Sequence, residues 1–251
     1  MTIRTQEFEG KVALITGAAK NIGRAIAIEL AAGGAAIAVN TRSSREDAEQ
    51  VAQQICASGG TAAVFMADIS DGDAVQSMVQ QIVARFGRID ILVLNASVRT
   101  EVPFLELTYA EWRRILGISL DGSFYCALAC IPHMIKAGGG SIVTLAGLNA
   151  LAGAKRRVHG SVAKHGMVGF TRALAREYAE QGIRVNSVAP GRMNTTRAAN
   201  RTPRPASLSA IPLGREGEPE EIATAVRFLC GPGASFINGQ TLHVNGGQMM
   251  F

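Results

Sequence analysis

The sequence predicts an α/β domain in which helices cover both faces of a doubly wound, parallel sheet, and three observations predict it. Short, apolar, partly β-branched segments alternate with segments of helical period along the chain. A glycine-rich turn joins the first apolar segment to the first helical one. The 251 residues, 47% of them hydrophobic, are enough for the core of one such domain. We therefore expect a single domain over residues 1–251.

Seven segments are expected to form the strands. Each is short, apolar and bounded by glycine, polar or charged residues, which is typical of a parallel strand that is buried on both faces. They are residues 12–16, 35–40, 62–68, 89–95, 141–146, 183–189 and 241–244. Their alternation with helical segments favours right-handed βαβ units joined in one parallel sheet.

The helices are predicted from the apolar period and from signals at their ends. In residues 71–86 the apolar side chains recur on one helical face, namely Val75, Met78, Val79, Ile82 and Val83. Ser44, three residues before Asp47, predicts a capping box at the start of the second helix. Paired glycines at 33–34 and 59–60 predict helix ends. Residues 197–211 form one long irregular segment, which we expect to be either a surface loop or a lid.

The first strand leads into the sequence TGAAKNIG, and a helix follows. Gly17 permits a tight turn, and Gly23 lets the helix approach the strand closely. The free N–H groups at the start of this helix would then face a pyrophosphate. The strand–turn–helix context therefore predicts a dinucleotide site that includes Lys20, Asn21 and Ile22.

The end of the second strand predicts which dinucleotide binds. An NAD site usually has a carboxylate here, which binds the ribose diol. This chain has no acid at that point, where its residues are Asn40, Thr41, Arg42 and Ser43. The planar guanidinium of Arg42 can bind a 2′-phosphate, and Lys20 adds a second cation on the same side. We predict NADP(H); the alternative is that both are exposed bases without a ligand.

The glycine turn resembles that of the short-chain dehydrogenase/reductase family, and further motifs follow in the family's order. They are Asp68-Ile69 after the third strand, Asn95-Ala96-Ser97 after the fourth, Pro190-Gly191 with Thr195 after the sixth, and Ile237-Asn238-Gly239-Gln240 with Asn245-Gly246-Gly247 near the end. The resemblance is strongest to 3-oxoacyl-acyl-carrier-protein reductases and related carbonyl reductases. It implies a Rossmann-type fold.

The turn, the second strand and the resemblance together give the predicted cofactor-binding set. Its members are Gly17, Lys20, Asn21, Ile22, Gly23, Asn40, Arg42, Ser43, Asp68, Ile69, Asn95, Ala96, Lys164, Pro190, Gly191, Met193 and Thr195. By the resemblance, the residues after the third strand hold adenine and those after the sixth contact the nicotinamide end.

The resemblance also implies a Ser-Tyr-Lys-Asn set, in which the tyrosine donates a proton to the substrate oxygen. Lys164 matches the family's lysine, but the tyrosine position four residues earlier is Gly160. The serine position is Gly147, and the asparagine position is Ser119. The resemblance therefore leaves Lys164 in place and replaces the other three side chains.

His159, one residue before the tyrosine position, is the predicted substitute, so the expected catalytic residues are Lys164, His159 and Ser119. Histidine exchanges a proton near neutral pH. One alternative is an ordinary histidine at a helix start that faces water. Another is that Arg156 and Arg157 polarise the substrate oxygen or bind its carboxylate.

Other classes of function are disfavoured. The first ten residues contain acids and no apolar run, so we expect no signal peptide, and no apolar run approaches a membrane span. The four cysteines have no CxxC spacing or Cys/His cluster, which predicts no metal site and a cytoplasmic protein. The net charge of +5, without interleaved aromatic residues, predicts no nucleic-acid partner.

The expected function is that of an NADP(H)-dependent oxidoreductase. Its substrate would be a small carbonyl or alcohol compound, either anionic or an acyl thioester. The alternative is a catalytically impaired NADP(H)-binding pseudoenzyme that acts as a sensor or scaffold. The family resemblance further implies a homotetramer that packs the helices within residues 112–134 and 161–181.

Overall fold

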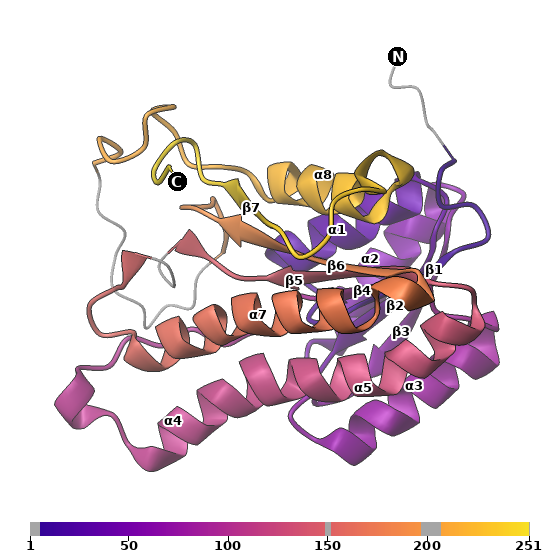
Figure 1. Cartoon of the computed structure of the whole chain (residues 1–251), viewed down its shortest axis with the longest axis horizontal. Coiled ribbons are helices and arrows are strands. Elements are labelled where there is room, and N and C mark those ends of the chain that lie inside the picture. The colour runs from indigo at the N-terminus through magenta and orange to yellow at the C-terminus, as the bar shows by residue number, and fades with distance from the viewer. Residues whose placement is uncertain (1–5, 149–151, 197–206, 251) are drawn as a thin grey trace.

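Seven strands form one parallel sheet in the computed structural model, which describes residues 6–148, 152–196 and 207–250 (Figure 1). The strands are β1 (Val12–Ile15), β2 (Ala36–Thr41), β3 (Thr61–Met66), β4 (Ile91–Leu94), β5 (Gly140–Leu145), β6 (Ile183–Pro190) and β7 (Thr241–Val244). Their order is β3-β2-β1-β4-β5-β6-β7, and every neighbouring pair is parallel. The predicted fold class is confirmed.

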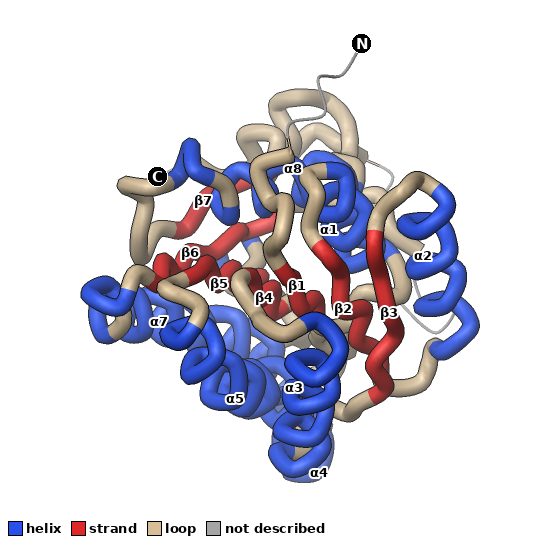
Figure 2. The backbone as a smooth tube through the Cα atoms, turned by 90° about the vertical axis from the view of Figure 1, so that its right-hand side faces the viewer, coloured by secondary structure: helices blue, strands red, loops and turns tan. Residues whose placement is uncertain are grey.

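Helices cover both faces of this sheet (Figures 1 and 2). One face carries α1 (Asn21–Ala32), α2 (Arg45–Ala57) and α8 (Pro219–Cys230). The other carries α3 (Gly72–Phe86), α5 (Gly122–Lys136) and α7 (Val158–Glu177), with α4 (Tyr109–Leu116) packed on α7. The sheet order reverses at β1, which pairs with β2 on one side and β4 on the other. A ligand site is expected at such a reversal, outside the carboxyl ends of the strands.

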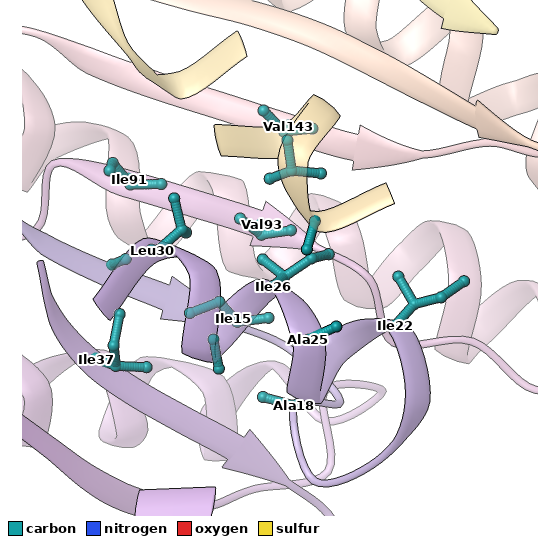
Figure 3. Packing of buried hydrophobic residues seen from close by; sticks show 14 of the residues in the cluster. Ile15, Ala18, Ile22, Ala25, Ile26, Leu30, Ile37, Ile91, Val93 and Val143 are labelled. Atoms are coloured by element: carbon teal, nitrogen blue, oxygen red, sulfur yellow. The ribbon is translucent and has the colours of Figure 1, made fainter. Parts of the chain in front are cut away.

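The two-residue period of the strands divides the core between the two faces. In β1, Ile15 packs toward α1 while Leu14 packs toward α3 and α5. In β4, Val93 belongs to the cluster that includes α1, and Leu94 belongs to the cluster that includes α3 and α5. Figure 3 shows Ile15 and Val93 together with Ile26 of α1 in the first of these clusters. Burial on both faces explains why β1 and β4 contain no polar residues.

The signals at helix ends are confirmed in part. Gly33 ends α1, and Gly59, in the left-handed region at φ 85°, follows the end of α2. The capping box predicted for Ser44 and Asp47 is wrong, because the Ser44 side chain makes no capping bond. Ser44 has ψ 60° and so is not extended, and Asp47 instead pairs with Lys20 at 3.0 Å.

Two further expectations from the sequence concern residues 197–211 and membrane-spanning segments. Of the irregular segment 197–211, residues 197–206 lie outside the described residues, so the choice between loop and lid stays open. The expectation that no segment approaches a membrane span is wrong by length and composition, because the continuous 28-residue helix Tyr109–Lys136 is apolar enough to cross one. Half of its most apolar window is buried inside the fold, where α5 packs on α3, so it serves here as a core helix.

We predict that Asp90→Asn lowers the free energy of unfolding. The buried Asp90 carboxylate joins the starts of β1 and β4, because it accepts hydrogen bonds from Val12 N at 3.0 Å, Lys11 Nζ at 3.1 Å and Arg88 Nε at 2.8 Å. The asparagine side chain has no negative charge, and its NH2 group would face the N–H groups that now donate to the carboxylate. We expect the free energy of unfolding to fall by about 2 kcal/mol. Urea unfolding measures this cost, with exposed Glu180→Gln as the control. Equal stability of the two variants would contradict it.

Candidate functional site

A cavity of about 380 Å³ opens at the carboxyl ends of β1 to β4, at the reversal of the sheet order. Most of the predicted cofactor-binding residues line it: Gly17, Lys20, Asn21, Ile22, Gly23, Asn40, Arg42, Ser43, Asp68, Ile69, Asn95, Ala96 and Thr195. Lining residues outside the predicted set are Thr41 and Ser97, which belong to the quoted motifs, and Ala67, Val98, Arg99, Ile118 and Thr196, which sequence reasoning missed. Lys164, Pro190, Gly191 and Met193 are not among the residues that line it.

The turn between β1 and α1 is held by Asn95 from the end of β4. The Asn95 side-chain amide donates to the carbonyls of Thr16 at 2.9 Å and Gly17 at 3.0 Å. Gly17 has φ +64°, and a Cβ on Gly23 would lie 2.3 Å from the Gly17 carbonyl oxygen. Only glycine allows this approach, which brings the start of α1 against the cavity. The turn therefore has the close backbone approach that the predicted phosphate site requires.

Thr16 also holds the turn between β1 and α1 against the end of β4, a role that the sequence motif alone does not reveal. Its hydroxyl accepts hydrogen bonds from Asn95 N at 3.0 Å and Ala96 N at 3.1 Å. On the other side of the turn, Asn21 Oδ1 accepts from Thr196 N at 2.9 Å. The cavity wall after β6 is thereby tied to the start of α1.

The end of the cavity at β2 contains the two predicted cations, each beside a carboxylate. Lys20 Nζ lies 3.0 Å from Asp47 Oδ2, and Arg42 Nη1 lies 3.6 Å from Asp68 Oδ2. Burial raises the pKa of Asp68, but the hydrogen bonds from Ser70 and the charge of Arg42 outweigh it and lower the pKa overall. All four charged side chains are more than a third exposed. Such ion pairs contribute little in water, so a dianionic phosphate can displace them at small cost.

Asn40, which is in the predicted cofactor-binding set and lines the cavity, also has a structural role. Its side chain is buried and donates to Phe65 O at 3.2 Å and Ala67 O at 3.3 Å, while its Oδ1 accepts from Gly17 N at 3.4 Å. It therefore fixes the ends of β2 and β3 against the glycine turn. That leaves Arg42 and Ser43, beyond the strand, to face a ligand.

The segment after β6 has a structural role at its first residues. A Cβ on Gly191 would lie 2.6 Å from Asn245 Cα, so glycine is needed for close packing against the turn after β7. Met193 is buried in the core cluster beside α8, which is why its side chain is not in the cavity wall. Thr195, two residues later, does line the cavity.

Lys164, on α7, reaches the carboxyl end of β5. Its Nζ donates to the carbonyl of Leu145, the last residue of that strand. Burial lowers the pKa of Lys164 to about 7, and the positive charge of Arg99 acts in the same direction. The predicted lysine thus lies near Arg99, and Arg99 lines the cavity.

The other family positions contain no large side chain. A Cβ at Gly147 or at Gly160 would meet no described atom within 4 Å, so both positions face open space. Ser119 is buried in the π-helical turn η2 (Gly117–Asp121), between α4 and α5. Its neighbour Ile118 lines the cavity. π-Helical turns often occur at functional sites, because they re-aim one side chain.

His159 is buried rather than facing water, so that alternative is wrong. Its Nε2 lies 2.8 Å from Thr100 Oγ1, which lies 2.6 Å from Glu111 Oε1. The carboxylate can only accept, so the single Thr100 proton goes to Glu111 and His159 Nε2 must carry a hydrogen. Burial lowers the pKa of His159, the charge of Glu111 acts against this, and the charge of Arg114 lowers it further. Its Nδ1 is buried without a hydrogen-bond partner.

Comparisons with known proteins agree with this geometry. A family model described as enoyl-(acyl carrier protein) reductase matches residues 17–249. The chain is 38% identical over 242 residues to a 3-oxoacyl-[acyl-carrier-protein] reductase of Synechocystis sp., covering 96% of this chain and 98% of the relative. It is 39% identical over 245 residues to FabG of Escherichia coli, covering 97% and 99%.

Two solved structures are also similar to this chain over nearly its whole length. A short-chain dehydrogenase/reductase from Brucella melitensis is similar with a TM-score of 0.90 and 38% identity, covering 98% of this chain and 100% of that one. The acetoin dehydrogenase YohF from Salmonella typhimurium is similar with a TM-score of 0.88 and 34% identity, covering 95% and 96%.

We predict that Gly23→Ala weakens dinucleotide binding by at least about tenfold. The new Cβ would lie 2.3 Å from Gly17 O and 2.6 Å from Asn95 Nδ2, so the turn must open, and overpacking of this kind costs about 1–3 kcal/mol. Fluorescence titration with NADPH measures the affinity. Gly169→Ala is the matched control, since it lies on the exposed side of α7 with open space around it. Unchanged binding by Gly23→Ala would refute the proposed cradle.

Proposed function

Because the chain belongs to the short-chain dehydrogenase/reductase family, we propose that it is an NADP(H)-dependent oxidoreductase that interconverts a carbonyl compound and its alcohol. One observation carries the proposal. The glycine cradle at the start of α1 opens into a cavity whose end at β2 contains Arg42 and Lys20. A dinucleotide with a 2′-phosphate matches this arrangement of donors and charge.

The residues of the cavity fit such a cofactor at three points. The N–H groups at the start of α1 suit the pyrophosphate, because the close approach of Gly23 to Gly17 leaves no side chain in the way. Arg42 and Lys20 suit the 2′-phosphate. Asp68 and Ile69 border the cavity next to β3, where they suit the adenine.

The chain's own residues would then orient the substrate and exchange its proton. The reduced nicotinamide, when bound, supplies a hydride for the carbonyl carbon. Lys164 lies at the carboxyl end of β5, from where it can bind the nicotinamide ribose. Of the other two residues in the predicted catalytic set, Ser119 lies in the π-helical turn beside the cavity, and His159 is bonded to Thr100.

The substrate class is proposed from the relatives. Several are named 3-oxoacyl-[acyl-carrier-protein] reductases, and one solved relative is an acetoin dehydrogenase. A small carbonyl substrate, with either an acyl thioester or an anionic group, suits a cavity that also carries Arg99.

A second candidate function is a catalytically impaired NADP(H)-binding protein, which would act as a sensor or scaffold. The open space at Gly147 and Gly160 favours it, because the family's serine and tyrosine are expected at these positions. We rank it below the enzyme, since Lys164 keeps a lowered pKa suited to proton exchange.

We further propose a cytoplasmic homotetramer. Apolar side chains on the outer sides of α5 and α7 are exposed in the single chain, namely Phe124, Leu128, Ile135 and Val162. An apolar stripe of this kind is typical of a surface that is buried by another copy. Cys126, Cys130 and Cys230 are buried as free thiols, which suits a reducing compartment.

We predict that Arg42→Ala weakens NADPH binding by about 10- to 100-fold and leaves NADH binding within about twofold. The loss corresponds to one charge-assisted contact with the 2′-phosphate. Isothermal titration calorimetry with both dinucleotides measures it. Arg45→Ala is the control, because this exposed cation on α2 pairs with Glu49 instead. Wild-type protein that binds NADH as tightly as NADPH would overturn the cofactor assignment.

We also predict that the wild-type chain oxidises NADPH when given carbonyl substrates. The assay uses 3-oxoacyl thioesters, diketones and 2-oxoacids, and follows absorbance at the dihydronicotinamide band. The double variant Gly147→Ser, Gly160→Tyr is measured beside it, since both new side chains enter open space. Turnover in the double variant alone, with NADPH bound tightly by both proteins, would favour the sensor or scaffold over the enzyme.

A further inference from the structure

The segment after β4 is attached to the rest of the fold at both of its ends. At its start, the backbone donates two hydrogen bonds to the Thr16 hydroxyl. At its end, residues 100–102 contact residues 156–159, around the start of α7. Between these attachments, residues 97–99 line the cavity. The position of this part of the cavity wall therefore depends on both attachments.

Three successive residues make the attachment to α7, which we call the loop clamp. Each of them contacts a different residue around the start of that helix. The contacts are Thr100 Oγ1 to His159 Nε2 at 2.8 Å, the ion pair of Glu101 with Arg157, and Val102 N to Arg156 O at 2.8 Å. The clamp thus combines a side-chain hydrogen bond, an ion pair and a backbone hydrogen bond.

The loop clamp contains two features that are unfavourable for folding. Arg156 has φ 61°, in the left-handed region that non-glycine residues rarely adopt. The His159 side chain is buried, and its Nδ1 has no hydrogen-bond partner among the described residues. Unfavourable features of this kind occur preferentially at functional sites, where the surrounding structure retains them. Stability alone therefore does not explain the clamp.

The Thr100 hydroxyl joins three elements of the fold. It lies 2.6 Å from Glu111 Oε1 on α4 and 2.8 Å from His159 Nε2 on α7. Glu111 is held in turn by Arg114, whose guanidinium donates to both carboxylate oxygens at 2.7 and 2.8 Å. α4 lies beside α7 (Figure 1) and leads into the π-helical turn whose Ile118 lines the cavity. One hydroxyl therefore connects two parts of the cavity wall with α7.

The direction of these hydrogen bonds determines the tautomer of His159. The hydrogen bond from Arg114 lowers the pKa of Glu111 to about 2, so its carboxylate is ionised and can only accept. The single Thr100 proton goes to Glu111, and the Thr100 oxygen accepts from His159 Nε2–H. A hydrogen on Nδ1 would have no acceptor among the described residues. His159 therefore supplies one donor, and that donor is used by Thr100.

We propose that His159 is a positioning residue, whose Nε2–H holds Thr100 and thereby fixes the segment after β4 against α7 in the geometry that a carbonyl substrate requires. This inference rests on the proposed NADP(H)-dependent function, and it gives His159 a role other than that of a proton donor. Loss of the hydrogen bond should lower turnover more than dinucleotide affinity, because Arg42 and Lys20 lie at the end of the cavity at β2, on other elements.

Two substitutions of His159 separate positioning from proton exchange. The glutamine amide of His159→Gln can donate to Thr100, but it cannot exchange a proton near neutral pH. We expect it to keep kcat within about threefold, whereas His159→Leu should lower kcat about 10- to 100-fold, as small displacements around a reacting centre do. NADPH affinity, from isothermal titration calorimetry, should change by less than about threefold in both. Exposed His165→Leu, on the same helix, is the matched control.

Two substitutions of Thr100 test the other side of the same bond, with kcat expressed per molecule that binds NADPH. Thr100→Val keeps the shape and removes the hydroxyl, so it should lower kcat as much as His159→Leu, whereas Thr100→Ser should keep it. The double variant Thr100→Val, His159→Leu should lose little more than either single variant, because both remove one interaction. Thr224→Val is the control, since this exposed hydroxyl bonds Glu220 O within α8.

A further measurement does not depend on turnover. In ¹⁵N NMR of protein labelled in the histidine rings, His159 should have a protonated Nε2 and an unprotonated Nδ1. A protonated Nδ1, or a His159→Gln variant as slow as His159→Leu, would overturn this inference alone. So would Thr100→Val with wild-type kcat, even at lowered stability, since that assigns the bond a structural role only. Wild-type protein that reduces no carbonyl compound would overturn the proposed function and this inference together.

Discussion

The close approach of α1 to the turn after β1 is the constraint on which the rest of the site depends. Gly23 can lie against Gly17 only because neither has a side chain, and Asn95 donates to both carbonyls of that turn. The Thr16 hydroxyl accepts hydrogen bonds from the backbone N–H groups of Asn95 and Ala96, which follow β4. One set of hydrogen bonds therefore fixes both the glycine turn and the start of the segment after β4, and residues 95–99 of that segment line the cavity.

The charged side chains that line the cavity come from different strand ends. Near the end of β2, Arg42 and Lys20 are exposed and pair with Asp68 and Asp47. In the proposed function, a 2′-phosphate would take the place of these carboxylates. Arg99, after β4, is a further cation among the described lining residues, and Asp68 is the one carboxylate among them.

The sequence predicts the fold and the position of the glycine turn well, because their signals are local. Seven apolar segments and a glycine turn specify the sheet and the start of α1 without any distant contact. Other roles depend on contacts between distant residues. Asp47 pairs with Lys20 instead of capping α2, Met193 joins the core, and His159 bonds Thr100 across 59 positions. Arg99 lies in an irregular loop after β4, where no period or spacing marks it as a site residue.

The loss of a tyrosine does not by itself remove the chemistry that the tyrosine performs. The requirement is a group with a proton to give near neutral pH and a second group that tolerates negative charge on oxygen. An ammonium with a pKa of about 7 meets the first condition, because desolvation and a neighbouring cation make its proton easy to lose. Gly147 and Gly160 leave open space where the family's serine and tyrosine are expected, so the chain has room for other groups to meet these two conditions.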